Sequence, residues 1–297
     1  MSLVEETQKK LRKLGAASEP RAAGLNRDVA RAATEGPVVD TEGATVKAKR
    51  VVVDIGALRA FGCIAEETQG REFAGQYREI KRPLIERSLV SEAGESAREP
   101  SVIMVTSALP GDGKTFTSIN LALSMARERD VSVLLVDADV QKADSSTVFG
   151  IRSERGLLDA LVDETIDVES LVLRTNLPGL SLLSCGTAVE GATELLSSQR
   201  MRHIVAKLLV ARHPRRIVLL DSPPLLITSE ARSIIGIAGQ AVVVIRAGKT
   251  PRRAVQDALA LFEHQHVGLV LNHMRRGLMQ GYYGYGYYGT ELSHSGR

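Results

Sequence analysis

The sequence predicts an α/β protein whose doubly wound, mostly parallel sheet carries a phosphate-binding P-loop, with a flexible N-terminal arm and a disordered Tyr/Gly-rich C-terminal tail. Two observations predict the sheet: short runs of Val, Ile and Leu recur from residue 100 onward, and stretches of helical period separate most of them. Near-continuous apolar runs are typical of strands covered on both faces, and this alternation is typical of parallel sheets. A glycine-rich segment after the first strong run predicts the P-loop.

Composition limits the class of protein. The 297 residues are 44% hydrophobic and 25% charged, as in soluble globular proteins. No apolar run approaches the roughly 18 residues of a spanning helix, and the start lacks the apolar core of a secretory signal, so we expect a cytoplasmic protein. Cys63 and Cys185 lie far apart and have no partners at zinc-ligand spacing, which favours neither a disulfide framework nor a zinc site.

Charge is nearly balanced. The chain has 38 Lys and Arg against 35 Asp and Glu, and the excess falls within residues 1–60. A balanced body does not favour the broad basic face that nucleic acid requires. We therefore expect no nucleic-acid partner.

Four segments are expected along the chain. Residues 1–50 are expected to form a flexible arm, 51–99 an extension and linker, 100–276 the P-loop domain and 277–297 a tyrosine-rich tail. In the arm, LVEETQKKLRKL predicts a short amphipathic helix, which either stays solvated or docks on a partner or anionic lipid. In the extension, VVVDI at 51–55 predicts a strand, and 72–89 predicts a helix that Pro83 kinks or ends.

The elements of the P-loop domain follow from the same patterns. Strands are expected at 102–106, 131–139, 180–184, 216–221, 241–245 and 267–272. Helices are expected at 115–129, 193–212, 229–238 and 251–264. Their order is that of a doubly wound sheet.

The segment SALPGDGKT, from Ser107 to Thr115, lies between the first of these strands and the first helix. In that setting glycines and a helix start direct backbone amides at one anion. Lys114 would reach the β- and γ-phosphates, and the Thr115 hydroxyl would join a magnesium shell. Ala108 stands where the first glycine of the GxxxxGK[ST] pattern belongs. The residues expected to hold the nucleotide here are Pro110, Gly111, Asp112, Gly113, Lys114, Thr115 and Phe116.

Carboxylates follow two of the predicted strands. VLLVDAD ends with Asp137 and Asp139, and IVLLDSPP places Asp221 at the end of another apolar run. In open α/β sheets the carboxyl ends of strands line the ligand crevice. We therefore expect all three aspartates beside the phosphate loop.

From about residue 70 to its end, the chain resembles the bacterial tyrosine autokinases of exopolysaccharide and capsule synthesis, which are deviant Walker P-loop ATPases related to MinD and ParA. The motifs that carry the resemblance are SALPGDGKT, the second motif LLVDAD and the Walker B motif LLDSPP with its paired prolines. Leu109 stands where MinD and ParA ATPases have a signature lysine, so the chain is more similar to the kinase branch. Its N-terminal segment looks like that of the separate cytoplasmic kinases beside exosortase-linked polysaccharide clusters.

The tail supports the resemblance, because the family carries a C-terminal tyrosine cluster. GYYGYGYYG supplies five phenols that glycine spacing would present in turn, which are the expected phosphoacceptors Tyr282, Tyr283, Tyr285, Tyr287 and Tyr288. Three departures from the family pattern concern other positions. Gln141 replaces a frequent arginine, Glu230 a frequent aspartate, and GQYREIK lacks the glutamate of the ExxRxxR assembly motif, which leaves a ring and a dimer both open.

The resemblance implies roles for these residues. Lys114 binds ATP, while Thr115, Asp137 and Asp221 hold Mg²⁺. Either Asp137 or Asp139 orients or deprotonates the phenol, whose ordinary pKa is about 10. Asn272, at the end of the last predicted strand, is a candidate contact for adenine.

The resulting hypothesis is an ATP-dependent tyrosine kinase that phosphorylates its own tail, in trans, and regulates polysaccharide polymerisation or export. The resemblance implies self-association, a membrane chain-length regulator that recruits the chain to the inner membrane face, and a tyrosine phosphatase as partners. The alternative is a MinD- or ParA-like positioning switch that binds ATP without modifying protein. Leu109 and the tyrosine tail favour the kinase.

Overall fold

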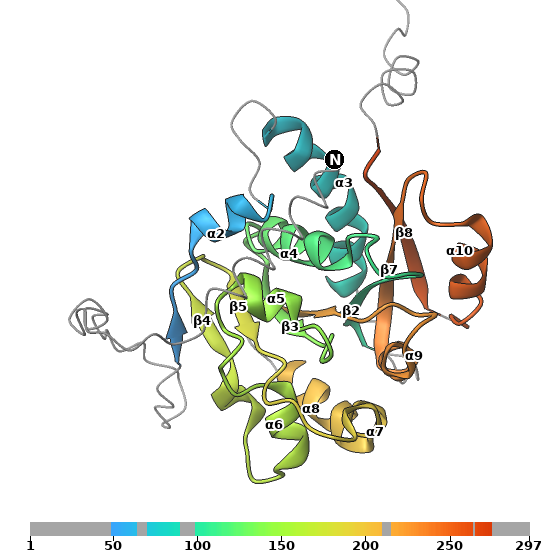
Figure 1. The fold of residues 1–297 in the computed structure, drawn as a ribbon. Coiled ribbons are helices and arrows are strands. Elements are labelled where there is room, and N and C mark those ends of the chain that lie inside the picture. Colours follow the sequence, from blue (N-terminus) through green and yellow to red (C-terminus); the bar gives the residue numbers. More distant parts are fainter. Residues whose placement is uncertain (1–48, 64–69, 90–98, 210–214, 264, 275–297) are drawn as a thin grey trace, which may run out of the picture. The chain divides into compact units, whose positions relative to one another are not determined.

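An eight-stranded sheet forms the centre of the described part of the chain (Figure 1). The computed structural model describes residues 49–63, 70–89, 99–209, 215–263 and 265–274. The amphipathic helix predicted in the N-terminal arm and the tyrosine cluster of the tail lie outside these residues. In these ranges no helix has the length and apolar character needed to cross a membrane.

The strand order is β1-β4-β5-β3-β6-β2-β7-β8. Every pairing is parallel except β4 with β5, which is antiparallel. This confirms the predicted mostly parallel sheet. The strands are β1 (Arg50–Val51), β2 (Glu99–Ser107), β3 (Val131–Asp137), β4 (Leu173–Thr175), β5 (Leu180–Leu183), β6 (Arg215–Asp221), β7 (Ala238–Arg246) and β8 (His266–Asn272).

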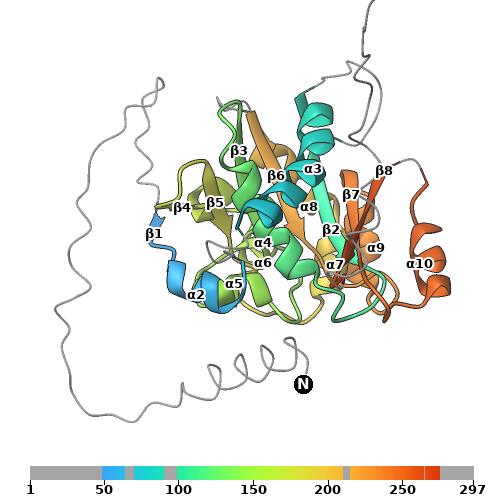
Figure 2. The same ribbon diagram turned by 90° about the horizontal axis from the view of Figure 1, so that it is seen from above.

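Helices cover both faces of the sheet, which explains its apolar strands (Figures 1 and 2). Along β2, Ile103 and Val105 pack on the face of α2 (Ile55–Ala60), α3 (Gly70–Leu89) and α4 (Lys114–Met125), whereas Val102 and Met104 pack on the other. The second face carries α6 (Leu157–Val162), α7 (Ala192–Ser197), α8 (Gln199–Leu209), α9 (Ser229–Ile235) and α10 (Arg252–Leu259). Two short elements, α5 (Asp144–Val148) and the 3₁₀ helix η1 (Val168–Leu171), complete the described fold.

The strand predicted at 51–55 is wrong beyond its first residue. Strand β1 ends at Val51, and helix α2 begins at Ile55. The Asp54 carboxylate accepts a hydrogen bond from the Gly56 amide at 2.7 Å and caps this helix. The cap satisfies an amide at the helix start. The β-branched residues before Asp54 favour a strand and give no sign of this helix.

Helix α3 continues through Pro83 to Leu89, so the expectation that the helix ends at Pro83 is wrong, whereas a kink there stays a prediction. The buried ammonium of Lys81 contributes to its packing on α4, since it donates to the Ser124 carbonyl and pairs with Glu128, both at 2.7 Å. In the stretch that replaces the family assembly motif, Lys81 is therefore occupied within its own chain.

The single helix predicted over 193–212 is two helices. Ser198 is extended between α7 and α8, and its hydroxyl oxygen accepts from the Met201 amide at 3.3 Å. The side chain thus supplies the cap with which α8 begins. Between the predicted strands at 131–139 and 180–184, the sequence patterns also missed α5, α6, η1 and β4.

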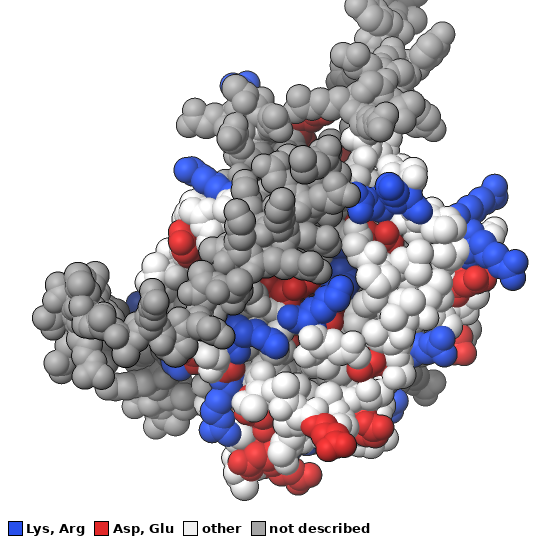
Figure 3. Space-filling view, in the orientation of Figure 1, with Lys and Arg blue, Asp and Glu red and all other residues white. Residues whose placement is uncertain are grey.

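Charged side chains are interspersed on the face shown in Figure 3. Lys and Arg lie among Asp and Glu over the described residues of that face. Neither sign forms a continuous patch there.

Candidate nucleotide site

The candidate site lies where β2, β3 and β6 end. In the parallel register Asp137 of β3 is opposite Asp221 of β6, and Asp221 is also opposite Val105 of β2. Strand β2 leads through the predicted P-loop into α4. The fold therefore brings the loop and both strand-end carboxylates to one edge of the sheet.

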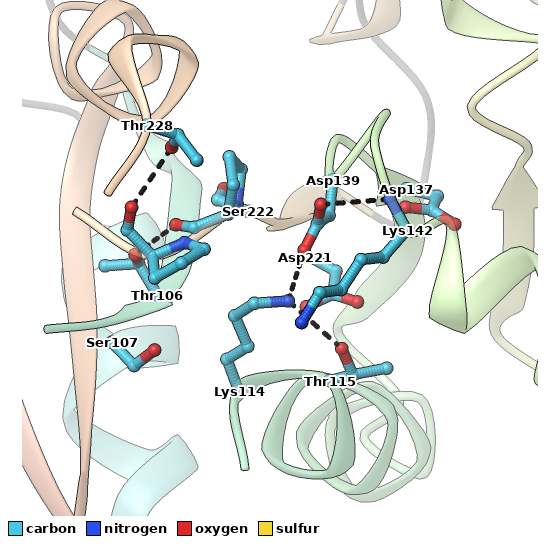
Figure 4. Close-up of polar contacts among 12 residues, drawn as sticks. Thr106, Ser107, Lys114, Thr115, Asp137, Asp139, Lys142, Asp221, Ser222 and Thr228 are labelled. Atoms are coloured by element: carbon cyan, nitrogen blue, oxygen red, sulfur yellow. Dashed lines mark hydrogen bonds and ion pairs between the residues drawn. The ribbon is translucent and has the colours of Figure 1, made fainter. Parts of the chain in front are cut away.

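Lys114 is buried at the first position of α4. Its ammonium donates to Asp139 Oδ2 at 2.5 Å and to the Thr115 hydroxyl at 3.5 Å (Figure 4). Burial by itself would lower the pKa of Lys114, but the carboxylates of Asp221 and Asp139 outweigh it and raise that pKa. The ammonium is therefore charged at neutral pH and neutralises part of the carboxylate charge around it.

Asp137 and Asp221 are both buried, and each uses one oxygen within the protein. The Ser146 amide donates to Asp137 Oδ2 at 2.8 Å, and the Ser118 hydroxyl donates to Asp221 Oδ1 at 3.0 Å. Burial raises the pKa of Asp137 and raises the pKa of Asp221 to about 7, with neighbouring carboxylates adding to both shifts. Both carboxyl groups therefore lose their protons less readily than an exposed aspartate does.

The second oxygens of these carboxylates fit a cation. Asp137 Oδ1 and Asp221 Oδ2 are buried and have no hydrogen-bond partner. Such atoms together with the Thr115 hydroxyl match the oxygen ligands that Mg²⁺ takes. In the described ranges no group of three or more His, Cys, Asp or Glu side chains is arranged to hold a metal. A site with two carboxylates agrees with magnesium bound jointly by protein and phosphates.

Asp112 fixes the middle of the P-loop. Its carboxylate accepts from the Thr250 hydroxyl at 2.7 Å and the Leu109 amide at 3.4 Å, and its carbonyl accepts from Asn272 Nδ2 at 3.0 Å. The Asn272 Oδ1 accepts from the His273 amide at 2.8 Å. Contact of Asn272 with adenine stays a prediction, because in this structure its amide group contacts the P-loop backbone.

Other predicted nucleotide contacts lie around this loop. Pro110 and Gly111 are exposed, whereas Phe116 is half-buried. The Phe116 ring lies 6.5 Å from that of Phe61 and 6.1 Å from that of Phe73, between ring centroids. Phe116 thus joins the P-loop helix to the N-terminal extension.

Three polar contributions at the site were not predicted. Ser118 was missed, although its position four residues after Lys114 places both on one side of α4. Thr250 gives no such signal, because only the fold brings it to Asp112. Gln141 and Glu230, noted separately as departures from the family pattern, hydrogen-bond to each other at 2.9 Å. The two departures therefore form one contact.

Gly113→Ala is expected to weaken ATP binding about tenfold or more. Gly113 has φ +100°, and a Cβ there would lie 2.0 Å from Asn272 Nδ2. Left-handed strain costs on the order of 1–3 kcal/mol, about tenfold in affinity, and the clash would also push the Asn272 amide away from the Asp112 carbonyl. Titration calorimetry of ATP measures the loss.

The matched control is Gly111→Ala. Gly111 also has a positive φ, +86°, but a Cβ there meets nothing within 4 Å. The control carries the backbone strain without the clash, so it should lose less affinity. Equal affinities for the two variants would contradict the assigned contact with Asn272.

Known proteins resemble this chain in sequence. Residues 101–264 match the AAA domain family. The chain is 31% identical over 219 residues to the tyrosine-protein kinase YwqD of Bacillus subtilis, which covers 73% of this chain and 86% of that protein. It is 30% identical over 177 residues to the tyrosine-protein kinase etk of Escherichia coli, which covers 59% of this chain but 24% of that protein.

Solved kinase domains are similar in fold. The VpsO kinase domain superposes with a TM-score of 0.56 at 27% identity and covers 71% of this chain and 100% of its own. The BceF tyrosine kinase domain gives a TM-score of 0.56 at 26% identity over 75% of this chain and 91% of its own.

Proposed function

Because this chain belongs to the AAA domain family and to the bacterial tyrosine-protein kinases, we propose that it is an ATP-dependent autokinase that phosphorylates tyrosines of its own tail. The observation that carries the proposal is the charge cluster at the strand ends. There Lys114 contacts Asp139, and two further carboxylates each keep an oxygen without a partner. The proposed acceptors are Tyr282, Tyr283, Tyr285, Tyr287 and Tyr288.

Lys114 and the amides of the P-loop bind the phosphates of ATP in this proposal. Thr115, Asp137 and Asp221 would hold Mg²⁺, which when bound neutralises charge on the phosphate oxygens. Lys114 leaves Asp139 as it turns to the phosphates. The carboxylate of Asp139 is then free to accept a hydrogen bond.

Phosphoryl transfer needs an acceptor in line with the leaving group. The phenol oxygen forms a bond to the γ-phosphorus, the bond from that phosphorus to the oxygen of the departing ADP breaks, and the phenol proton passes to a carboxylate. Asp139 takes this role if Asp137 is held by the cation, and Asp137 is the alternative. A free phenol has a pKa of about 10, so a neighbouring base assists the reaction at neutral pH.

The tail is proposed to reach the site of a neighbouring copy. Mixing two variants tests this: a Lys114→Ala chain keeps the tyrosines, and a chain with the five tail tyrosines changed to Phe keeps the site. Phosphate on the Lys114→Ala tail is expected only in the mixture. An unmodified tail in the mixture would contradict transfer between copies.

The proposed physiological role is regulation of polysaccharide polymerisation or export. The support is the resemblance described above, which also implies a membrane chain-length regulator that recruits the kinase and a phosphatase that removes the phosphate. Each phosphate adds about −1.5 to −2 charges to the tail. Repeated modification therefore changes strongly how the tail interacts with basic side chains.

Phosphopeptide mapping of the full chain tests the central claim. Incubation with ATP and Mg²⁺ is expected to place phosphate on residues within 282–288, and the five-fold Tyr→Phe variant is expected to show none there. A chain that binds ATP but stays unmodified, also with a membrane partner added, would instead support the ATP-dependent positioning switch.

A further inference from the structure

Lys142 lies in the turn between β3 and α5, directly after the paired aspartates. Its amide donates to the Asp139 carbonyl at 3.1 Å and to Asp139 Oδ1 at 3.4 Å. The next residue, Ala143, is buried, has φ +48°, and donates its amide to the same carbonyl at 2.7 Å. The backbone that carries Lys142 is therefore fixed against Asp139.

The side chain of Lys142 is exposed and extends back toward Lys114 and Thr115 (Figure 4). The Lys114 side chain extends into the site from the start of α4, whereas the Lys142 side chain extends toward it from the turn after β3, on the opposite side. For the Lys142 ammonium, no hydrogen bond or ion pair with another described residue is assigned. A solvated lysine on a turn is the ordinary alternative, but this one points into the site.

The charges of the site explain why a second ammonium would be needed there. Three buried carboxylates, of Asp137, Asp139 and Asp221, face one buried ammonium, that of Lys114. A triphosphate adds several negative charges to this cluster, and the charge on the transferred phosphoryl group is spread over its three equatorial oxygens. Lys114 is one ammonium beside three carboxylates, so it alone cannot balance the charge that the triphosphate adds.

We propose that Lys142 supplies a second ammonium, which binds the terminal phosphate of ATP from the side opposite Lys114. The inference rests on the proposed function and names a further catalytic residue for it. Lysine suits the role, because its flexible four-carbon stem can carry a point charge along with a moving phosphoryl group. Contact with the terminal phosphate makes Lys142 selective for ATP over ADP.

Calorimetric titration of the full chain with ATP and, separately, with ADP tests the proposal. The proteins are the wild type, Lys142→Ala, Lys142→Arg and the control Lys207→Ala, whose lysine is exposed on α8. Lys142→Ala is expected to bind ATP about tenfold more weakly, as for loss of one charge-assisted hydrogen bond, and ADP less than about twofold more weakly. Lys142→Arg should keep most of the ATP affinity, and Lys207→Ala should bind both nucleotides like the wild type.

The outcomes separate this inference from the proposed function. Wild type that binds neither nucleotide would refute the nucleotide site as a whole. Wild type that binds ATP, with Lys142→Ala equal to it or weakened equally for ATP and ADP, would overturn the contact with the terminal phosphate alone. If Lys142→Ala unfolds at the same temperature as the wild type, a folding defect is excluded. If Lys142→Ala is instead destabilised, Lys142→Arg decides: loss of its selectivity for ATP over ADP would overturn the proposal.

Discussion

Lys114→Met is expected to lower tail phosphorylation on the order of 10²- to 10³-fold, the range measured when one preorganised charge-stabilising donor is removed from an enzyme. Methionine keeps most of the unbranched side chain but loses the ammonium that contacts Asp139 at 2.5 Å. The loss should appear in both ATP affinity and transfer rate, because Lys114 is proposed to bind the phosphates in both states. Quantitative phosphopeptide mapping and ATP titration measure the two effects.

Lys207→Met provides the control for Lys114→Met. Lys207 is exposed on α8, on the other face of the sheet from α4. The Lys207→Met protein should phosphorylate its tail at the wild-type rate. A folded Lys114→Met protein that still modified its tail at more than a tenth of that rate would contradict the role given to Lys114.

Asp221→Asn is expected to abolish phosphorylation and, without nucleotide, to stabilise the fold at pH 8. Burial raises the pKa of Asp221 from its ordinary value of 3.8 to about 7. Between these values the folded chain retains a proton that the unfolded chain has lost, so the free energy of unfolding falls as pH rises. Asparagine removes this penalty, roughly 4 kcal/mol at pH 8, since one unit of pKa corresponds to about 1.4 kcal/mol.

Urea unfolding at pH 5 and pH 8 measures the effect. The gain for Asp221→Asn over wild type should be small at pH 5 and largest at pH 8. Asp257→Asn is a control, because Asp257 is an exposed residue of α10. An Asp221→Asn protein no more stable than wild type at pH 8 would contradict the assigned cost of the buried carboxylate.

The sequence predicted the central strands well, because a strand covered on both faces must be apolar along its length. It failed where a single polar contact decides an element. The run VVVDI has strong strand propensity, yet Asp54 caps a helix there. Strand β4, Leu173–Thr175, is too short for any pattern, and its pairing with β5 becomes visible only in the fold.

The site was predictable in its residues and less so in its contacts. Lys114, Thr115, Asp137, Asp139 and Asp221 were expected together, and the parallel register places Asp137 opposite Asp221. The sequence could not show that Lys114 forms its ion pair with Asp139. Nor could it show that Thr250 hydrogen-bonds to Asp112, 138 residues earlier in the chain. Such contacts depend on how loops from different strands meet at the sheet edge.

The order of strands constrains when the protein can acquire its site during synthesis. In the described sheet, strand β2, which leads into the P-loop, pairs only with β6 and β7. Val102 is paired with Val218 of β6, and Met104 with Ala241 of β7. Pairings between such distant segments form slowly, and unpaired apolar strands promote aggregation meanwhile. A nascent chain that ends before β6 would carry the phosphate loop on a strand without neighbours. Most of the chain must therefore be synthesised before the phosphate loop is held in place and a bound nucleotide can stabilise the fold.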